Sequence, residues 1–158
     1  MPIEIERKFL AHPSVLEHCR SGISIVQGYL LTDSENTIRI RRMDDRYFLA
    51  WKGKRRGASR VELEQEVARE IGAVMLATVA SRHRIEKVRH RIEAHGHVWE
   101  VDLFAGALSG LILAEVELER EDEEVVFPAW LGREVTSDER YRNSCLAART
   151  FRSLPIAA

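Results

Sequence analysis

The sequence has few of the features that mark secreted, membrane-spanning or multidomain proteins. Only two of its 158 residues are cysteines, Cys19 and Cys145, and their wide separation matches no metal-ligand or redox spacing. This usage favours a reducing compartment. No apolar run approaches the ~20 residues that a membrane helix requires, and the N-terminus enters a strand pattern without a basic leader. We therefore expect a cytoplasmic protein with no membrane partner.

Linkers and low-complexity tracts are also missing. No stretch rich in Pro, Gly or Ser divides the chain, and no repeat recurs at a fixed period. A length of 158 residues suits one domain with a core of its own, so we expect residues 1–158 to form a single domain. The 24 Lys and Arg residues nearly balance the 25 Asp and Glu residues, so the net charge does not indicate a nucleic-acid partner.

Strand patterns dominate the chain, separated by turn residues. They span residues 2–10, 25–32, 36–43, 46–53, 60–67, 84–95, 98–104 and 111–120. Helical patterns are fewer and span residues 13–20, 68–79 and 144–150. Hairpin-length connections dominate, and no strand–helix–strand rhythm is sustained. These patterns predict an α+β fold, a closed eight-stranded antiparallel β-barrel with helices packed outside.

Charged residues gather on one face of nearly every predicted strand. Because side chains alternate between the two faces of a strand, Glu4, Glu6 and Lys8 share one face, opposite Ile3 and Ile5. The charged faces of the other strands carry Arg39, Arg41, Lys52, Arg60, Glu62, Glu64, Glu66, Lys87, Arg89, Arg91, Glu93, Glu100, Asp102, Glu115, Glu117 and Glu119. A solvated outer face would explain any single strand, but such faces usually contain more neutral polar residues. We therefore expect the charged face to line the interior.

Clustered acids and bases in one interior predict a cation and a polyanion bound together, because unpaired buried charge is strongly unfavourable. The acids are Glu4, Glu6, Glu62, Glu64, Asp102, Glu115 and Glu117, and their oxygen ligands suit Mg²⁺ or Mn²⁺. The bases are Lys8, Arg39, Arg41, Lys52, Lys87 and Arg89, which suit several phosphate oxygens at once. Phosphoryl transfer needs mainly positioning and charge neutralisation. The sequence thus predicts metal-dependent hydrolysis of a triphosphate.

The first strand, MPIEIERKFL, resembles the opening signature of the CYTH superfamily, the triphosphate tunnel metalloenzymes, whose motif is Glu-x-Glu-x-Lys. Further matches follow in the family's order: GYL at 28–30, TIRIRR at 37–42, WKG at 51–53, RVELE at 60–64, KVR at 87–89, and the segments 99–119 and 135–147. The resemblance covers nearly the whole chain. Within this superfamily the sequence resembles the bacterial inorganic triphosphatases.

The resemblance implies an eight-stranded tunnel, a Mg²⁺ or Mn²⁺ cofactor and substrates that carry a triphosphate. It assigns the metal to Glu4, Glu6, Glu115 and Glu117, and it places Glu62, Glu64, Asp102 and Glu115 near a second metal or the attacking water. It assigns the phosphates to Lys8, Arg39, Arg41, Lys52, Lys87 and Arg89. We add Tyr29, which either hydrogen-bonds a phosphate or a site lysine or simply packs in its strand.

Several functions stay open. The first is hydrolysis of inorganic tripolyphosphate to pyrophosphate and phosphate, by water attack on a terminal phosphorus, since the chain shows no obvious nucleoside pocket. The alternatives are an adenylate cyclase of the CYTH type and a thiamine or nucleoside triphosphatase. A non-catalytic module that binds polyphosphate belongs to a different class. The oligomeric state is also open, with a homodimer among the alternatives.

Other charged and polar positions have two interpretations each. The basic run 54–56 either steers a polyanion to the tunnel mouth or forms a solvated loop, which we favour. The triplet 95–97 is expected to be a hairpin turn and not a metal site. Asn143 or Ser144 is expected to cap the last helix. Arg140 either reaches the tunnel or makes a structural ion pair.

Overall fold

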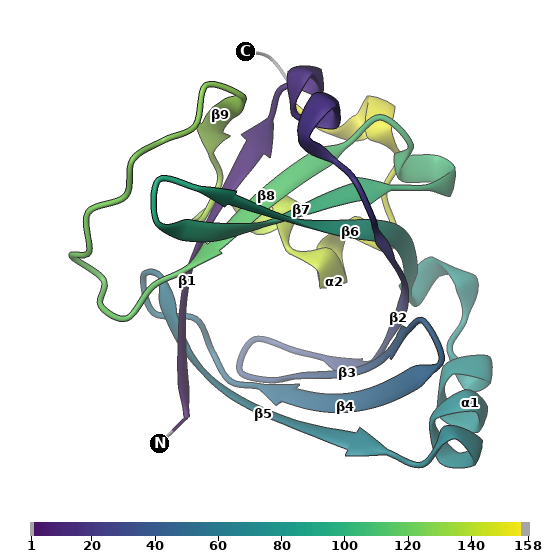
Figure 1. Ribbon diagram of the computed structural model, residues 1–158. Coiled ribbons are helices and arrows are strands. Elements are labelled where there is room, and N and C mark those ends of the chain that lie inside the picture. Colours follow the sequence, from purple (N-terminus) through teal and green to yellow (C-terminus); the bar gives the residue numbers. More distant parts are fainter. Residues whose placement is uncertain (1, 156–158) are drawn as a thin grey trace.

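A computed structural model of the chain describes residues 2–155, in which eight strands form a ring (Figure 1). The strands are β1 (Ile3–Ala11), β2 (Ile23–Thr32), β3 (Thr37–Met43), β4 (Arg46–Lys52), β5 (Ser59–Val67), β6 (Arg84–Ala94), β7 (His97–Phe104) and β8 (Ile112–Glu117). Neighbouring strands are antiparallel in the order β5-β4-β3-β2-β6-β7-β8-β1, and β1 also pairs with β5. The predicted closed, eight-stranded antiparallel barrel is confirmed.

The closure of the ring is short. Only Ile3, Glu4 and Ile5 of β1 pair with β5. Further along, the same edge of β1 pairs with a ninth strand, β9 (Leu131–Glu134), which the sequence prediction missed. Four residues reading LGRE show no alternation of apolar and polar side chains, so this strand forms only because the edge of β1 offers free hydrogen-bonding groups there.

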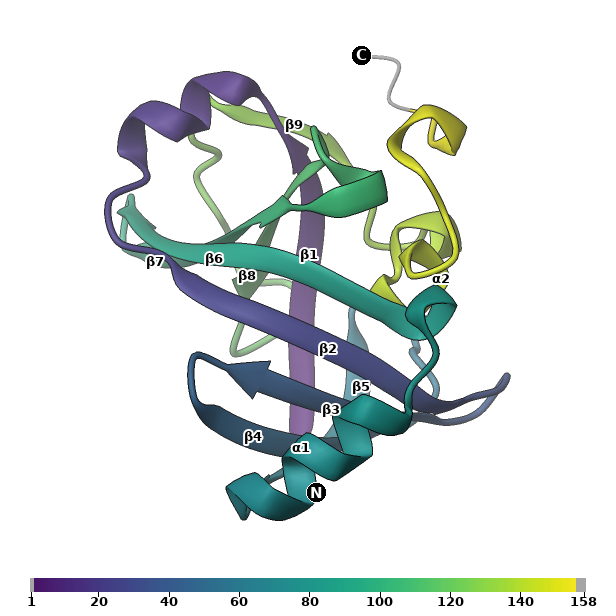
Figure 2. The same ribbon diagram turned by 90° about the vertical axis from the view of Figure 1, so that its right-hand side faces the viewer.

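The helical segments are short, apart from α1 (Arg69–Thr78). The other segments are α2 (Asn143–Leu146) and the 3₁₀ turns Pro13–His18, Ser81–His83, Gly106–Leu108, Glu139–Tyr141 and Phe151–Ser153. The expected helix at 68–79 is confirmed, whereas 13–20 forms a 3₁₀ turn and 144–150 contains only part of α2. Figure 2 shows α1 against the outer wall of the barrel and α2 toward one end of it.

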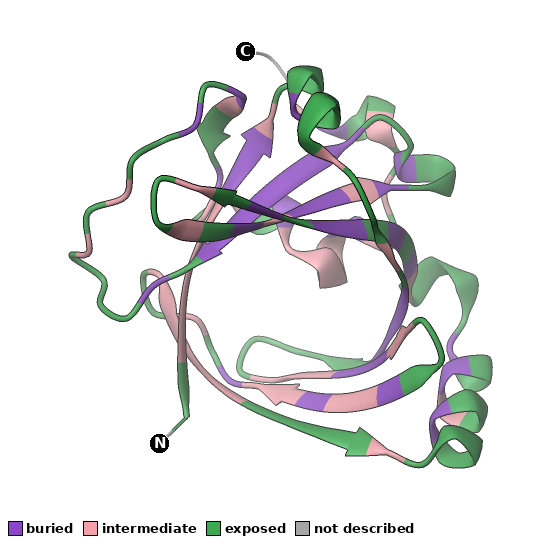
Figure 3. Cartoon of the chain, in the orientation of Figure 1, coloured by how far each residue is buried: buried purple, intermediate pink, exposed green. Residues whose placement is uncertain are grey.

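Apolar side chains cover the outside of the barrel, as the alternation predicted. Under α1, Ile40 and Tyr47 pack against Leu76 and Val79. The contact is close because Gly72 lacks a side chain; a Cβ there would lie 2.4 Å from the Tyr47 side chain. On the outer faces of β1, β7 and β8 a second cluster forms, consisting of Phe9, Val15, Ile92, Trp99, Val101, Ile112, Ala114, Val116, Leu118 and Trp130. Figure 3 shows the buried residues on these strands and on the inner side of α1.

One end of the barrel interior is apolar, which the sequence prediction did not foresee. Leu10, Ile85 and Leu113 continue the inward faces of β1, β6 and β8 beyond their charged residues, and they pack with Tyr141 and Leu146 of the C-terminal segment. The charged interior is therefore limited to one part of the barrel. Arg91 and Glu93, which the alternation assigned to the charged face, are exposed.

None of the helices within residues 2–155 is both long enough and apolar enough to span a membrane.

Candidate active site

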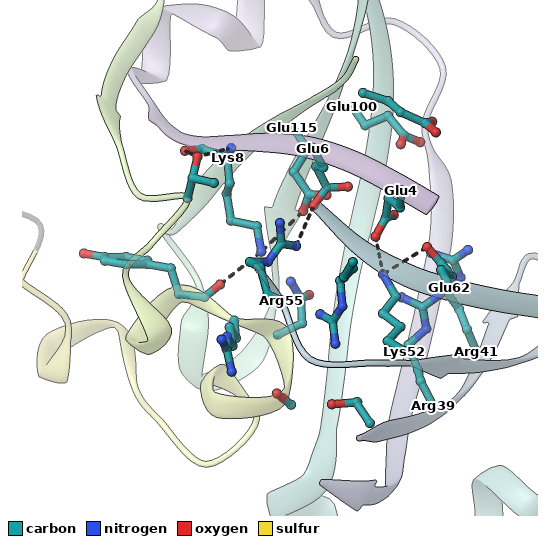
Figure 4. A pocket seen from close by; sticks show the side chains of 18 of the residues that line it. Glu4, Glu6, Lys8, Arg39, Arg41, Lys52, Arg55, Glu62, Glu100 and Glu115 are labelled. Atoms are coloured by element: carbon teal, nitrogen blue, oxygen red, sulfur yellow. Dashed lines mark hydrogen bonds and ion pairs between the residues drawn. The ribbon is translucent and has the colours of Figure 1, made fainter. Parts of the chain in front are cut away.

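A cavity of about 440 Å³ opens inside the barrel, lined by the inward side chains of the strands (Figure 4). Its volume falls in the range of ~300–1,000 Å³ typical of small-molecule sites. All but one of the predicted site residues line it: Glu4, Glu6, Lys8, Tyr29, Arg39, Arg41, Lys52, Glu62, Glu64, Lys87, Arg89, Glu115 and Glu117. The exception is Asp102. The strands therefore bring together residues that lie more than a hundred positions apart in the sequence.

Strands β1 and β8 bring four acids to one side of this cavity. Glu6 lies opposite Glu117 in the strand register, and Lys8 lies opposite Glu115. Burial raises the pKa of Glu6 well above its usual value, and the negative charges of Glu115 and Glu4 raise it further. Burial also raises the pKa of Glu4 and of Glu117. Burial would raise the pKa of Glu115 too, but Lys8 and Arg89 hold it well below its usual value.

The donor set suits a hard divalent cation. It consists only of carboxylates, whose mutual repulsion a cation would relieve, and Mg²⁺ commonly uses one or two carboxylates while keeping several waters. Among residues 2–155, no three His, Cys, Asp or Glu side chains are gathered tightly enough to hold a metal as they stand. The acids of β1 and β8 thus have the right chemistry and share one wall, but their side chains would have to converge on the ion.

The six predicted phosphate-binding cations all contact carboxylates. On β3, Arg39 and Arg41 both donate to Glu64, at 2.9 and 3.1 Å. On β4, Lys52 lies 3.3 Å from Glu4 and 3.4 Å from Glu62. On β1, the Lys8 ammonium lies 3.8 Å from Glu115. Figure 4 shows Lys52, Arg39 and Arg41 on the same side of the cavity as Glu62.

The guanidinium groups of β3 keep unused hydrogen-bonding capacity. The Nε atoms of Arg39 and Arg41 are buried and have no partner among the described residues. Burial lowers the pKa of Arg41 to about 10, and the nearby charges of Arg39 and Arg89 contribute to the shift. Unpaired donors and crowded positive charge both favour an anion in this part of the cavity.

Asp102 lies behind the cavity wall and not on it. Its carboxylate is fully buried and accepts hydrogen bonds from Arg89 at 2.7 and 2.9 Å, while the Lys87 ammonium lies 2.7 Å away. Burial would raise the pKa of Asp102, but Arg89 and Lys87 lower it below its usual value. Burial lowers the pKa of Lys87 to about 8, against the opposing effect of Asp102. This geometry gives Asp102 the position of a group that holds two cations in place.

A family model described as the CYTH domain matches residues 2–151 of the chain. The chain belongs to the CYTH domain family. Two relatives are named inorganic triphosphatase. The one from Acetivibrio thermocellus is 38% identical over 152 residues, covering 95% of this chain and 96% of that protein. The one from Nitrosomonas europaea is 39% identical over 150 residues, covering 91% of this chain and 96% of that protein.

Solved structures are similar over much of the same CYTH region. A crystal structure of an inorganic triphosphatase superimposes with a TM-score of 0.64 at 34% identity, covering 94% of this chain and 96% of that one. A putative adenylyl cyclase from Hippeastrum, described as having a dominant triphosphatase activity, gives a TM-score of 0.54 at 16% identity, covering 76% and 80%. At that identity the second likeness bears on the fold alone.

This CYTH cavity contains charged residues that the sequence assignment left out. We favoured a solvated loop for the basic run 54–56, and for Arg55 this is wrong. Lys54 and Arg56 are exposed, but Arg55 lines the cavity and its guanidinium lies 3.8 Å from the Glu6 carboxylate. A loop has no side-chain period that could have predicted this. Arg60 and Glu100 also line the cavity. The alternation had placed both on the charged face, so that signal was available although no role was assigned.

Two amides form hydrogen bonds beside the site: Asn143 lines the cavity, whereas Gln27 is fully buried on β2 and does not line it. Gln27 donates to the Tyr29 hydroxyl at 2.7 Å and to the Asn143 side-chain oxygen at 3.1 Å. The same Asn143 oxygen accepts a hydrogen bond of 2.9 Å from Lys87. The expectation that Asn143 or Ser144 caps the last helix is wrong, because Arg142 is the N-cap residue of α2. Burial raises the pKa of Tyr29 to about 12, so its hydroxyl stays protonated and can donate.

Two other sequence expectations concern residues beside the site. Arg140 makes an ion pair of 2.6 Å with Asp138 and is not among the residues that line the cavity, which supports the structural interpretation. The triplet at 95–97 is a hairpin turn, with positive φ angles at His95 and Gly96. His97 then contacts Glu123 at 2.6 Å and does not line the cavity either.

Proposed function

We propose that this CYTH protein hydrolyses inorganic tripolyphosphate to pyrophosphate and phosphate with Mg²⁺ or Mn²⁺ as cofactor. The observation that carries the proposal is the division of one cavity into an acidic wall on β1 and β8 and cations on β3, β4 and β6. The acidic wall consists of Glu4, Glu6, Glu115 and Glu117. The names of the two curated relatives and of the crystal structure support the same activity.

The substrate would lie between the acids and the cations. Arg39, Arg41, Lys87 and Arg89 would bind the non-bridging oxygens, with the Nε groups of Arg39 and Arg41 as free donors. Glu4, Glu6, Glu115 and Glu117 would hold the divalent ion, which when bound supplies charge neutralisation at the phosphoryl oxygens. Water would attack the terminal phosphorus, and the broken P–O–P bond would leave pyrophosphate and phosphate.

The remaining acids would act through their neighbours. Glu64 accepts hydrogen bonds from both Arg39 and Arg41, so it would fix the two guanidinium groups. Asp102 would do the same for Arg89 and Lys87. Glu62 lies next to Glu4 and Lys52 on the cavity wall, where it could orient the attacking water.

The lining of the cavity favours an inorganic substrate over a nucleotide. An adenylate cyclase must bind adenine and direct the ribose hydroxyl to the α-phosphorus, which calls for an apolar or hydrogen-bonding pocket for the base. Among residues 2–155, the only aromatic side chains that line this cavity are Tyr29 and Tyr141, and most of the lining is charged. The acidic wall, which would hold a divalent ion beside the phosphates, favours catalysis over a module that only binds polyphosphate.

A comparison of substrates tests the proposal. We expect the protein with Mg²⁺ or Mn²⁺ to convert tripolyphosphate to equal amounts of pyrophosphate and phosphate, with kcat/KM on the order of 10² or more above the values for ATP and thiamine triphosphate. Phosphate, pyrophosphate and cyclic AMP are measured for each substrate. Cyclic AMP from ATP would favour the cyclase, and tripolyphosphate that binds without turnover would favour the binding module.

The wider expectations stay predictions. They are a single domain over residues 1–158, a cytoplasmic location, no nucleic-acid or membrane partner, and a homodimer as one alternative for the oligomeric state. Light scattering on the purified protein measures the last of these directly.

A further inference from the structure

Three arginines line the cavity in addition to the six predicted phosphate-binding cations. Arg55 lies in the loop between β4 and β5, Arg60 near the start of β5, and Arg142 immediately before α2. The loop holds two of them in place: Arg55 donates to the Ala58 carbonyl at 3.0 Å, and Arg60 donates to the Gly53 carbonyl at 3.1 Å. We call these three residues the arginine cluster.

The arginine cluster is less well neutralised than the other cations. The structure gives Arg60 no ion pair within residues 2–155, and the contact of Arg55 with Glu6 is long, at 3.8 Å. Arg142 pairs with the exposed Glu139 at 3.4 Å. All three arginines are partly buried and line the same cavity. Guanidinium groups that repel one another in a partly buried space favour a bound anion.

The arginine cluster lies next to the acidic wall. Arg60 is the strand partner of Glu4, and Arg55 approaches Glu6. Figure 4 shows Arg55 below Glu6, whereas Arg39 and Arg41 lie toward Glu4 and Glu62. The acids expected to hold the metal are therefore flanked by cations in two separate parts of the cavity. Hydrolysis of a polyphosphate produces two anions that repel each other, and two groups of cations give each anion a place.

We propose that the arginine cluster is a second anion subsite, which binds the phosphate group of an inorganic polyphosphate that Arg39 and Arg41 do not contact. Planar guanidinium groups suit this role because each can donate two parallel hydrogen bonds to a phosphate. The inference rests on the proposed triphosphatase function and adds to it. In this arrangement the third phosphate of tripolyphosphate binds at the arginine cluster. Pyrophosphate has only two phosphates and binds wholly at the cations of β3 and β6.

The single variants Arg55→Ala and Arg142→Ala test this subsite. Each removes one arginine of the cluster, and the two arginines belong to different elements. We expect each to raise the KM for tripolyphosphate about tenfold, as the loss of a charge-assisted pair of hydrogen bonds would. The inhibition constant of pyrophosphate should stay within about twofold of the wild-type value. Arg56→Ala is the matched control, because Arg56 is exposed in the same loop and does not line the cavity.

Two results would contradict the proposed subsite. An unchanged KM in both variants would mean that the arginines bind no part of the substrate, and equal weakening of tripolyphosphate and pyrophosphate would mean that they supply only a general positive potential. Arg142 is partly exposed, so its variant stays informative if Arg55→Ala fails to fold. If the wild type does not hydrolyse tripolyphosphate, the proposed function fails. The subsite can still be tested by calorimetric titration of tripolyphosphate and of pyrophosphate into the Mg²⁺-loaded wild type and variants, because the variants should weaken the binding of tripolyphosphate about tenfold and that of pyrophosphate by no more than about twofold.

Discussion

Replacing Glu6 by glutamine should lower kcat for tripolyphosphate by about 100-fold or more while leaving the metal-free protein at least as stable as the wild type. Loss of a group that acts on charge in a transition state costs on the order of 10²–10³ in rate. Stability should not fall, because burial and the charges of Glu115 and Glu4 already disfavour an ionised Glu6. Glutamine keeps the shape of the side chain and removes that charge.

The pH dependence of stability gives a second measurement on this variant. The pKa of Glu6 is raised above 4.5 in the folded protein, so the folded state binds more protons than the unfolded state between 4.5 and the raised value. The free energy of unfolding of the metal-free wild type should therefore fall as the pH rises through this window, and the Glu6→Gln variant should show less of this fall. Urea unfolding in the presence of a chelator measures it.

Glu119→Gln is the control for Glu6→Gln. Glu119 follows β8, is exposed and does not line the cavity, although it has the same side chain two positions beyond Glu117. Its replacement should leave both kcat and stability near the wild-type values. Near-normal turnover by Glu6→Gln would remove Glu6 from the site.

The variant Arg41→Ala should lose about 100-fold or more in kcat/KM for tripolyphosphate without losing stability. Arg41 brings to the cavity a buried Nε group without a partner, so its removal takes away a donor that only the substrate would use. Its positive charge is crowded by Arg39 and Arg89, and Glu64 keeps its hydrogen bond to Arg39 when Arg41 is gone. Activity is measured as phosphate release, and stability by urea unfolding.

Arg42→Ala provides the comparison on the same strand. Arg42 is the next residue along β3 and does not line the cavity, so its side chain belongs to the outer face. We expect its kcat/KM to stay close to that of the wild type. If Arg41→Ala and Arg42→Ala behaved alike, the assignment of the inward face of β3 would be wrong.

Alternation along the strands was sufficient to predict which strand residues line most of the candidate site. It assigned Glu4, Glu6 and Lys8 to one face of β1 without any knowledge of what lay across the barrel, because side-chain direction in a strand depends only on position. The predicted site residues of the other strands followed by the same rule, and all of them except Asp102 line the cavity. Glu66, Arg91 and Glu93, which the rule also placed on the charged face, are exposed and lie outside the cavity.

Alternation does not predict how far along the barrel a residue lies or what stands in front of it. Asp102 has the expected direction, but Lys87 and Arg89 lie between it and the cavity. The inward face also changes from charged at Glu115 to apolar at Leu113, where the C-terminal segment packs. Both features depend on tertiary packing, which the period of a single strand does not contain.

The residues that the sequence missed lie mostly outside regular strands. Arg55 belongs to a loop and Asn143 to a single helical turn, and neither element has a period that predicts side-chain direction. The loop between β4 and β5 turns Arg55 inward by a hydrogen bond to Ala58, a contact that only the folded loop reveals. The C-terminal segment places Asn143 beside Lys87 from a distance of 56 residues in the chain.

The most direct measurement of the central claim is tripolyphosphate turnover by metal-free protein before and after a divalent cation is added back. With the ion removed by a chelator, the acidic wall repels the substrate and the cations alone bind it, so we expect no measurable release of phosphate. Addition of Mg²⁺ or Mn²⁺ should restore the release of one phosphate and one pyrophosphate per tripolyphosphate. Equal turnover with and without the cation would contradict the account.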